Sequence, residues 1–177
     1  KGLGVVDDVR GKQEESLEHY KQSYGFFMEI KDTLNAFKSV FNEGMIYRKL
    51  KQAELAKDAF EKSAVVFERY DFEYGVVLCD VNIGIIYFDT DKFKIALDYF
   101  KEAYQKMKTL GGSDVNLLMN IGNCYYKLEE EDSAFFYLDK AYDEALSTNH
   151  YQSFATLQNT LGHLYLDRKQ YEKAEDL

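Results

Sequence analysis

Proline and tryptophan are both absent from this chain of 177 residues, and cysteine occurs only twice. Because no proline forces a break in a helix, the breaks are expected at Gly, Asp, Asn and Ser. Cys79 and Cys124 lie far apart, each in an apolar stretch. This placement favours two buried small hydrophobic residues over a disulfide or a metal site, and reduced thiols fit a cytoplasmic setting.

Long apolar runs and an excess of basic residues are lacking as well. No run approaches the roughly 18 apolar residues of a membrane-spanning helix, and no signal peptide is visible. The formal net charge is -9. Nucleic acid requires a face of Lys and Arg, so the acidic balance argues against it. We therefore expect a cytoplasmic protein with neither a membrane nor a nucleic acid as partner.

What is abundant is apolar and aromatic residues, at 46% and 16% of the chain, and they repeat. Four segments align on a glycine, and each glycine is followed by a tyrosine three residues later and an alanine twelve later. Sixteen residues after the glycine comes a large apolar residue, Phe60, Phe100 or Leu138. The aligned glycines are Gly44, Gly84, Gly122 and Gly162, spaced 40, 38 and 40 residues apart, and Gly4 lies 40 before Gly44.

This pattern has a packing logic. A glycine one turn before a tyrosine lets a second helix approach closely, and the alanine of the next helix is the other small residue at the crossing. Large residues then fill the space on either side. Helical spacing of apolar residues, as in Ile95, Tyr99, Ala103 and Met107, supports helices throughout. Expected helix starts are Asp32-Thr33, Asp91, Asp114 after Gly111-Gly112, and Asn149-His150.

The series of offsets resembles the tetratricopeptide repeat, lengthened from 34 to about 40 residues. Repeats of this length resemble those of bacterial peptide receptors and Rap-type regulators, cell-polarity adaptors, kinesin light chains and bacterial sensor modules. HEAT and armadillo repeats have a similar length but lack this series. The resemblance implies an all-α fold, an α-solenoid of tandem antiparallel hairpins that form a superhelix with about ten helices.

We expect a single solenoid domain over residues 1–177. Its repeats run roughly over residues 1–31, 32–71, 72–111, 112–149 and 150–177. The first and last repeats are incomplete, which predicts a fragment of a longer protein.

In this family the first helix of each repeat lines a concave wall. In this chain several of the inward positions carry asparagines, and a side-chain amide can both donate hydrogen bonds to and accept them from an extended peptide backbone. The asparagines either bind a ligand in this way or bond a neighbouring helix. The inward apolar residues either form a partner surface or pack into the core, and the inward basic residues either hold a carboxylate or are solvated. The predicted groove residues are Asn42, Asn82, Asn120, Asn123, Met45, Ile85, Phe88, Tyr126, Arg48 and Lys49.

Residues arranged for catalysis or metal binding are not recognisable. The histidines His19, His150 and His163 have no metal-ligand spacing, although His163 takes an inward position. The run Glu129-Glu130-Glu131-Asp132 is expected to start a helix rather than to bind calcium. We predict no cofactor and no enzymatic activity of this chain by itself.

The sequence thus favours a protein-protein interaction module that binds a peptide or a partner segment in its concave groove. The alternative is the sensory or oligomerising region of a larger bacterial signalling enzyme, such as a kinase, a cyclase or a transcription regulator. Self-association through the solenoid ends is a third expectation, since uncapped ends expose apolar edges.

Overall fold

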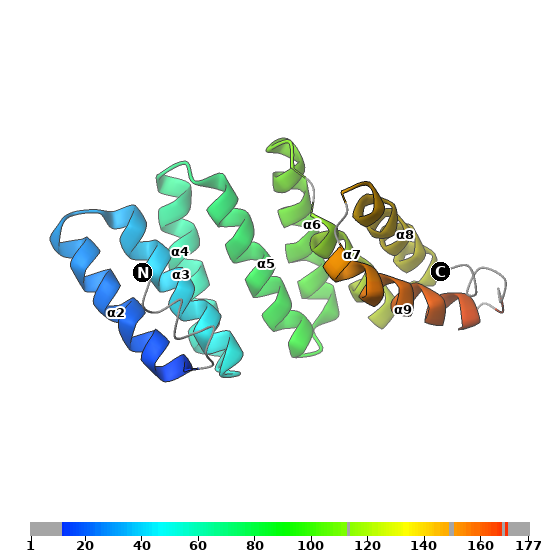
Figure 1. The fold of residues 1–177 in the computed structure, drawn as a ribbon, viewed down its shortest axis with the longest axis horizontal. Coiled ribbons are helices and arrows are strands. Elements are labelled where there is room, and N and C mark those ends of the chain that lie inside the picture. The colour runs from blue at the N-terminus through cyan, green and yellow to red at the C-terminus, as the bar shows by residue number, and fades with distance from the viewer. Residues whose placement is uncertain (1–11, 113, 149–150, 168, 170–177) are drawn as a thin grey trace. The chain divides into compact units, whose positions relative to one another are not determined.

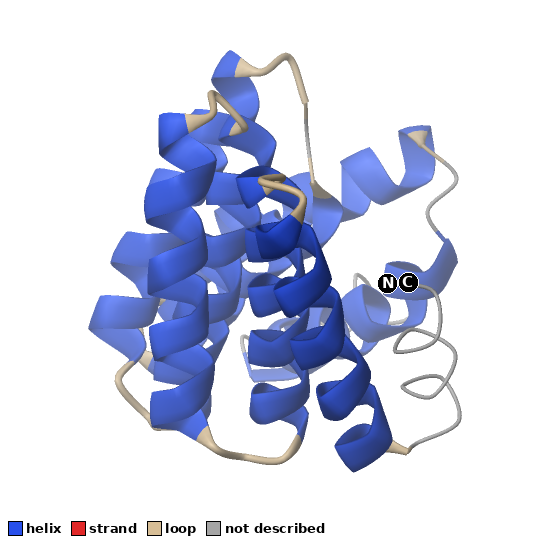
Figure 2. Cartoon of the chain, turned by 90° about the vertical axis from the view of Figure 1, so that its left-hand side faces the viewer, coloured by secondary structure: helices blue, strands red, loops and turns tan. Residues whose placement is uncertain are grey.

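The computed structural model describes residues 12–112, 114–148, 151–167 and 169, and all regular structure within them is helical (Figures 1 and 2). Short turns join the helices into consecutive hairpins. The eight helices of the described residues are α2 (Gln13–Glu29), α3 (Thr33–Lys49), α4 (Ala53–Arg69), α5 (Glu73–Asp89), α6 (Phe93–Thr109), α7 (Val115–Lys127), α8 (Glu131–Ser147) and α9 (Tyr151–Asp167).

The described residues thus contain eight helices, against an expected total of about ten. The all-helical class and the tandem hairpins are confirmed. The first helix of the first repeat, with Gly4, and the second helix of the last repeat, with Ala174, were expected in segments outside the described residues.

The chain divides into two compact units, an N-terminal unit, Lys1–Ile86, and a C-terminal unit, Tyr87–Leu177. In the N-terminal unit α3 packs against both α2 and α4. In the C-terminal unit α7 packs against α6 and α8, while α9 packs on α8 and touches α7. Each three-helix set, α2–α3–α4 and α6–α7–α8, therefore places the first helix of one repeat between two second helices.

Most helices have 17 residues and are followed by a turn of three, which produces the repeat of about 40. In each described turn one residue adopts a left-handed conformation that ends the helix. Only Gly111 among these is a glycine. The expectation that Gly, Asp, Asn and Ser alone provide the breaks is thus wrong, because lysine and glutamate also take this place. The non-glycine turn residues are Lys31, Lys51, Asp71, Asp91, Glu129 and Lys169.

The predicted helix starts are partly confirmed. The Asp32 carboxylate accepts a hydrogen bond from the backbone N–H of Asn35 at 3.1 Å, and Asp114 accepts from Asn116 at 2.8 Å. Asp91 is not a cap: it is the left-handed turn residue, and Lys92, the N-cap residue of α6, makes no side-chain capping hydrogen bond. The predicted junction at Asn149-His150 lies outside the described residues.

Gly44 and Gly122 set the crossings of their helices. A methyl group built on Gly44 would lie 2.8 Å from the Phe60 ring, and one on Gly122 would lie 2.5 Å from Leu138 Cγ. Phe60 and Leu138 are the large residues of the repeat, and both are fully buried. Any side chain at either glycine would hold the two helices of its hairpin apart.

Candidate functional site

The predicted groove residues follow one face of the first helix of each repeat. On α3, Asn42, Met45 and Lys49 are spaced as residues on one helix face. Asn42 and Met45 are half-buried and Lys49 is exposed. A helix face that changes from half-buried to exposed along its length can contact a second chain while it remains packed at its edges.

The same face of α7 has the same character in the C-terminal unit. Asn120 and Asn123, one turn apart, are both half-buried, and Tyr126 is 38% exposed. The neighbouring α9 touches α7 and presents His163, which is exposed. Two carboxamides and a phenol therefore line a partly open face beside a second helix.

Asn82 differs from the other asparagines. Its side chain is only 6% exposed, and its Nδ2 donates to the backbone carbonyl of Leu78, one turn earlier on α5, at 2.7 Å. The bond occupies one donor of the amide within its own helix. This geometry matches the intramolecular alternative for Asn82.

The remaining apolar and basic candidates are neither fully buried nor fully exposed. Ile85, Phe88 and Arg48 are half-buried, and Phe88 packs edge-on against Phe93, with ring centroids 5.3 Å apart. Phe41 of α3 is also half-buried, and its ring packs against the buried Phe60 ring, with centroids 5.3 Å apart.

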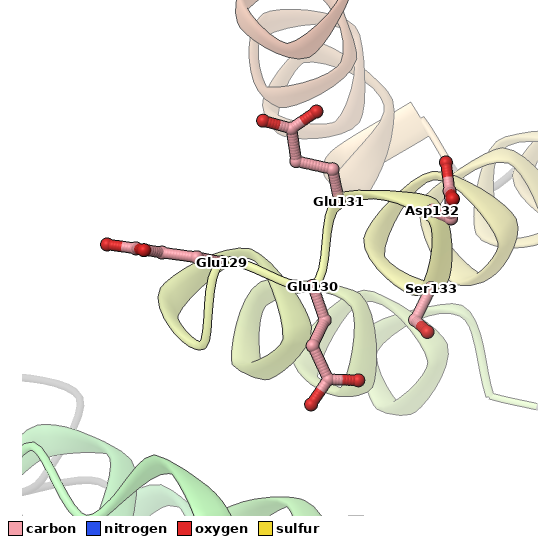
Figure 3. Close-up of a pocket in the computed structure, with 5 residues that line it drawn as sticks. All are labelled: Glu129, Glu130, Glu131, Asp132 and Ser133. Atoms are coloured by element: carbon pink, nitrogen blue, oxygen red, sulfur yellow. The ribbon is translucent and has the colours of Figure 1, made fainter.

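The acidic run lies on an open surface. Residues Glu129–Ser133 line a shallow depression at the start of α8, and Figure 3 shows the side chains of Glu130 and Glu131 pointing in opposite directions. Across the described residues, no group of three or more His, Cys, Asp and Glu side chains is placed to hold a metal ion. The run begins α8 at Glu131, as expected.

The cysteines are buried as expected, Cys79 in the N-terminal unit and Cys124 in the C-terminal unit, and both are free thiols. Burial raises the pKa of Cys124 to about 12. Burial, with a smaller contribution from the neighbouring charge of Asp80, raises the pKa of Cys79 further above its ordinary value. Neither thiol is therefore activated as a nucleophile.

A pocket of about 360 Å³ between α2, α3 and α4 was not expected from the sequence. Glu43 and Ala59 distinguish it from the other repeats. The position of Glu43 is occupied there by Ile83, Ile121 and Leu161, and the position of Ala59 by Tyr99 and Tyr137. In the sequence, these two differences lie one residue before and fifteen residues after the aligned glycine. The lining residues are Lys21, Tyr24, Phe37, Val40, Glu43, Tyr47, Leu55, Asp58, Ala59 and Lys62.

Comparison with known proteins agrees with this architecture. The family model of the tetratricopeptide repeat matches residues 37–64 and 115–147. The second match coincides with the hairpin of α7 and α8, and the first covers most of α3 and α4. Each of these two segments therefore matches a tetratricopeptide repeat.

More particularly, the chain is similar to Rap-type proteins. It is 22% identical to response regulator aspartate phosphatase E of Bacillus subtilis over 144 residues, 78% of this chain and 38% of that protein. The crystal structure of a Rap protein complexed with competence and sporulation factor matches 98% of this chain and 49% of its own, with a TM-score of 0.80 and 19% identity. At this identity the structural likeness shows the fold, and the resemblance to Rap-type regulators is confirmed at that level.

A third similar protein, BtubC from P. vanneervenii, has a crystal structure that matches 98% of this chain and 73% of its own, with a TM-score of 0.84 and 19% identity. The chain thus spans less than half the length of the Rap-type relatives it matches, and nearly three quarters of this one.

No described helix is long and apolar enough to cross a membrane.

Proposed function

We propose that this chain is a protein-protein interaction module that holds an extended peptide or partner segment against the first helices of its repeats. The single observation that carries the proposal is the α7 face. There Asn120 and Asn123 are half-buried and one turn apart, next to the exposed ring of Tyr126. Carboxamides satisfy both the N–H and the C=O groups of an extended backbone, and an exposed aromatic ring adds apolar contact area.

The proposed contact residues of the C-terminal unit are Asn120, Asn123 and Tyr126 on α7. Those of the N-terminal unit include Asn42, Met45, Arg48 and Lys49 on α3. Asn82, Ile85 and Phe88 on α5 complete the set, Asn82 as a packing residue because its amide already donates to Leu78. The Rap-type relative was crystallised with competence and sporulation factor, and another similar structure contains a Rap regulator with the Phr* peptide. Both support a peptide as the class of ligand.

The acidic balance of the chain gives the ligand a preferred charge. A net charge of -9 repels an acidic peptide at long range, so we expect a neutral or basic peptide with locally complementary side chains. The predicted absence of catalytic activity and the alternative of a sensory region in a larger signalling enzyme both stay predictions.

The test begins with selection of linear twelve-residue peptides from a displayed library on the 177-residue chain. A selected peptide is then titrated calorimetrically into the native chain and into the variants Asn120→Ala and Asn123→Ala. Each variant should weaken binding about 3- to 10-fold, because each loses one or two hydrogen bonds between neutral groups. The melting temperature should stay unchanged, since both side chains are partly exposed.

The matched control is Gln105→Ala, which removes an exposed carboxamide from α6, a second helix of a repeat. It should leave the affinity unaltered. Undiminished binding by the variant that lacks both Asn120 and Asn123 would refute the proposed role of the α7 face.

A further inference from the structure

The pocket between α2, α3 and α4 lies on the opposite side of α3 from the proposed peptide face. It is lined on α3 by Val40, Glu43 and Tyr47, whereas Asn42 and Met45 belong to the peptide face. At 100° per residue the two sets project from opposite sides of the helix. A ligand in the pocket would therefore not compete directly for Asn42 or Met45.

The C-terminal unit contains the equivalent of this pocket, because α6, α7 and α8 repeat the arrangement of α2, α3 and α4. Four lining residues are identical between the two places. Lys21 and Tyr24 of α2 correspond to Lys101 and Tyr104 of α6, Tyr47 of α3 to Tyr125 of α7, and Lys62 of α4 to Lys140 of α8.

In the C-terminal unit this place is filled by the chain itself. The ring of Tyr137 stacks on Tyr125, with centroids 5.5 Å apart and planes inclined by 17°. The Lys101 ammonium lies 5.0 Å from the Tyr125 ring centre, and Lys140 Nζ donates to Tyr104 Oη at 2.6 Å. The same stack recurs between Tyr87 and Tyr99, at 5.5 Å and 22°.

Two residue differences leave the equivalent space in the N-terminal unit unfilled. Ala59 stands where Tyr137 supplies its ring, and Glu43 stands where Ile121 is completely buried. Among the described residues no ring stacks on Tyr47, and no N–H or O–H group donates a hydrogen bond to the Glu43 carboxylate. The remaining space is about 360 Å³, more than twice a cavity that takes up benzene.

Glu43 gives this space a chemical preference. Its carboxyl group is half-buried, and burial raises its pKa while the charge of Lys21 acts in the opposite direction. The other nearby carboxylate, Asp58, is already paired with Lys62 Nζ at 2.6 Å. Glu43 is therefore the acceptor that gains most from a donor or a cation brought in by a ligand.

We propose that the pocket binds an aromatic ring that carries a hydrogen-bond-donating or cationic group. The ring stacks on Tyr47 in the place that Tyr137 takes against Tyr125, and the donor bonds to Glu43. Tyr24 and Phe37 already form a T-shaped pair, with ring centroids 6.0 Å apart, so the walls that would hold the ring are themselves aromatic.

The probe is tyramine, which joins a phenol ring to an ammonium group, titrated into the ¹⁵N-labelled 177-residue chain and followed by NMR. Its dissociation constant should be on the order of 1 mM, as ligand efficiency allows for so small a molecule. p-Cresol, which lacks the ammonium group, and butylamine, which lacks the ring, should each bind about tenfold more weakly. Backbone signals of Tyr47 and Ala59 should shift, and those of Tyr125 and Tyr137 should not, because that place is occupied.

Acetyl-Gly-Tyr-Gly-amide identifies the source of the ring. If it binds at least as tightly as p-cresol, the pocket serves a side chain of a partner polypeptide, and if it does not, the pocket serves a free aromatic amine.

Two variants test the geometry. Ala59→Tyr should abolish tyramine binding, because its ring fills the space as Tyr137 does, and circular dichroism checks that the variant is folded. Glu43→Gln should weaken tyramine about tenfold and leave p-cresol unaffected. The proposal is overturned if tyramine at about 10 mM shifts no signal of the pocket. It is equally overturned if a folded Ala59→Tyr variant binds tyramine as the native chain does.

Discussion

At the scale of the residue, the smallest side chains decide how the helices cross. A methyl group on Gly122 would lie 2.5 Å from Leu138 Cγ and 3.3 Å from the Leu138 backbone nitrogen, so Leu138 cannot simply rotate away. We expect Gly122→Ala to lower the free energy of unfolding by about 1–3 kcal/mol. Urea denaturation followed by circular dichroism measures the change.

Gly25 provides the matched control, because no described atom lies within 4 Å of a methyl group built there. Gly25→Ala in α2 should be neutral or should stabilise the chain by up to about 1 kcal/mol, since alanine favours the helix. If both variants lost the same stability, close approach at Gly122 would not be the cause.

Glu43 predicts a dependence of stability on pH. Burial raises the pKa of this carboxyl in the folded chain above its unfolded value, so its ionisation costs stability at neutral pH. As the pH falls through the folded pKa, the folded state takes up the proton and the cost disappears. Glu43→Gln should therefore be more stable than the native chain at pH 7, and the difference should vanish near pH 4.

The charged neighbours of Glu43 are Lys21 on α2, and Asp58 and Lys62 on α4. Burial raises the pKa of Glu43, and of these three charged groups only Lys21 affects it, by lowering it. Glu61→Gln removes an exposed carboxylate from α4 and serves as the control for the loss of one negative charge. Thermal melts of both variants between pH 4 and 7 check the prediction, and a constant advantage of Glu43→Gln across this range would contradict it.

At the residue scale, structural information lies both in the repeated glycine motif and in the residues that depart from it. Gly44 and Gly122 predict their crossings with Phe60 and Leu138 because one small and one large residue must meet there. The repeat pattern does not predict the pocket, because the pocket results from two residues that depart from the pattern, Glu43 and Ala59. The burial of Asn82 could not be predicted, since its amide bonds to the backbone of its own helix, and Asn42 has the same residue type in the same repeat position.

At the scale of the element, most turns between the described helices contain a residue that is poorly suited to its backbone conformation. Each left-handed turn residue ends a helix, yet most are lysine, aspartate or glutamate, for which this conformation costs energy. Lys51 has φ 58°. We expect Lys51→Gly to raise the free energy of unfolding by about 1 kcal/mol, because glycine takes this conformation without the steric cost of a Cβ.

The opposite exchange tests the same idea in the C-terminal unit. Gly111 has φ 72°, and no described atom lies within 4 Å of a methyl group placed there, so Gly111→Ala should lose stability through the backbone alone. Denaturant titration of the two variants should give changes of opposite sign. Two changes of equal sign would show that the turns do not limit the hairpins.

Helix boundaries were predictable where a side chain supplies the cap and unpredictable where the turn does. Asp32 and Asp114 cap their helices as expected because a short carboxylate reaches the free N–H groups of the first turn. Asp91 has the same residue type but lies one residue earlier, where the chain turns through the left-handed region. Sequence alone does not distinguish the two uses of aspartate.

At the scale of the whole molecule, the repeat pattern predicts a single domain, and the two cysteines allow that prediction to be tested. Cys79 belongs to the N-terminal unit and Cys124 to the C-terminal unit, and both thiols are completely buried. Since the reactive species is the thiolate and burial raises both pKa values, neither should react until its own unit opens. Each thiol thus reports on one unit.

In a single cooperative domain both thiols become reactive at the same free energy of opening, whereas repeats that open independently expose them separately. We predict equal opening free energies for Cys79→Ala and Cys124→Ala, each of which keeps one thiol, in labelling by a thiol reagent at rising urea concentration. Circular dichroism of both variants controls for the substitution itself. A difference of more than about 1 kcal/mol that exceeds their difference in global stability would mean that the units unfold as separate domains.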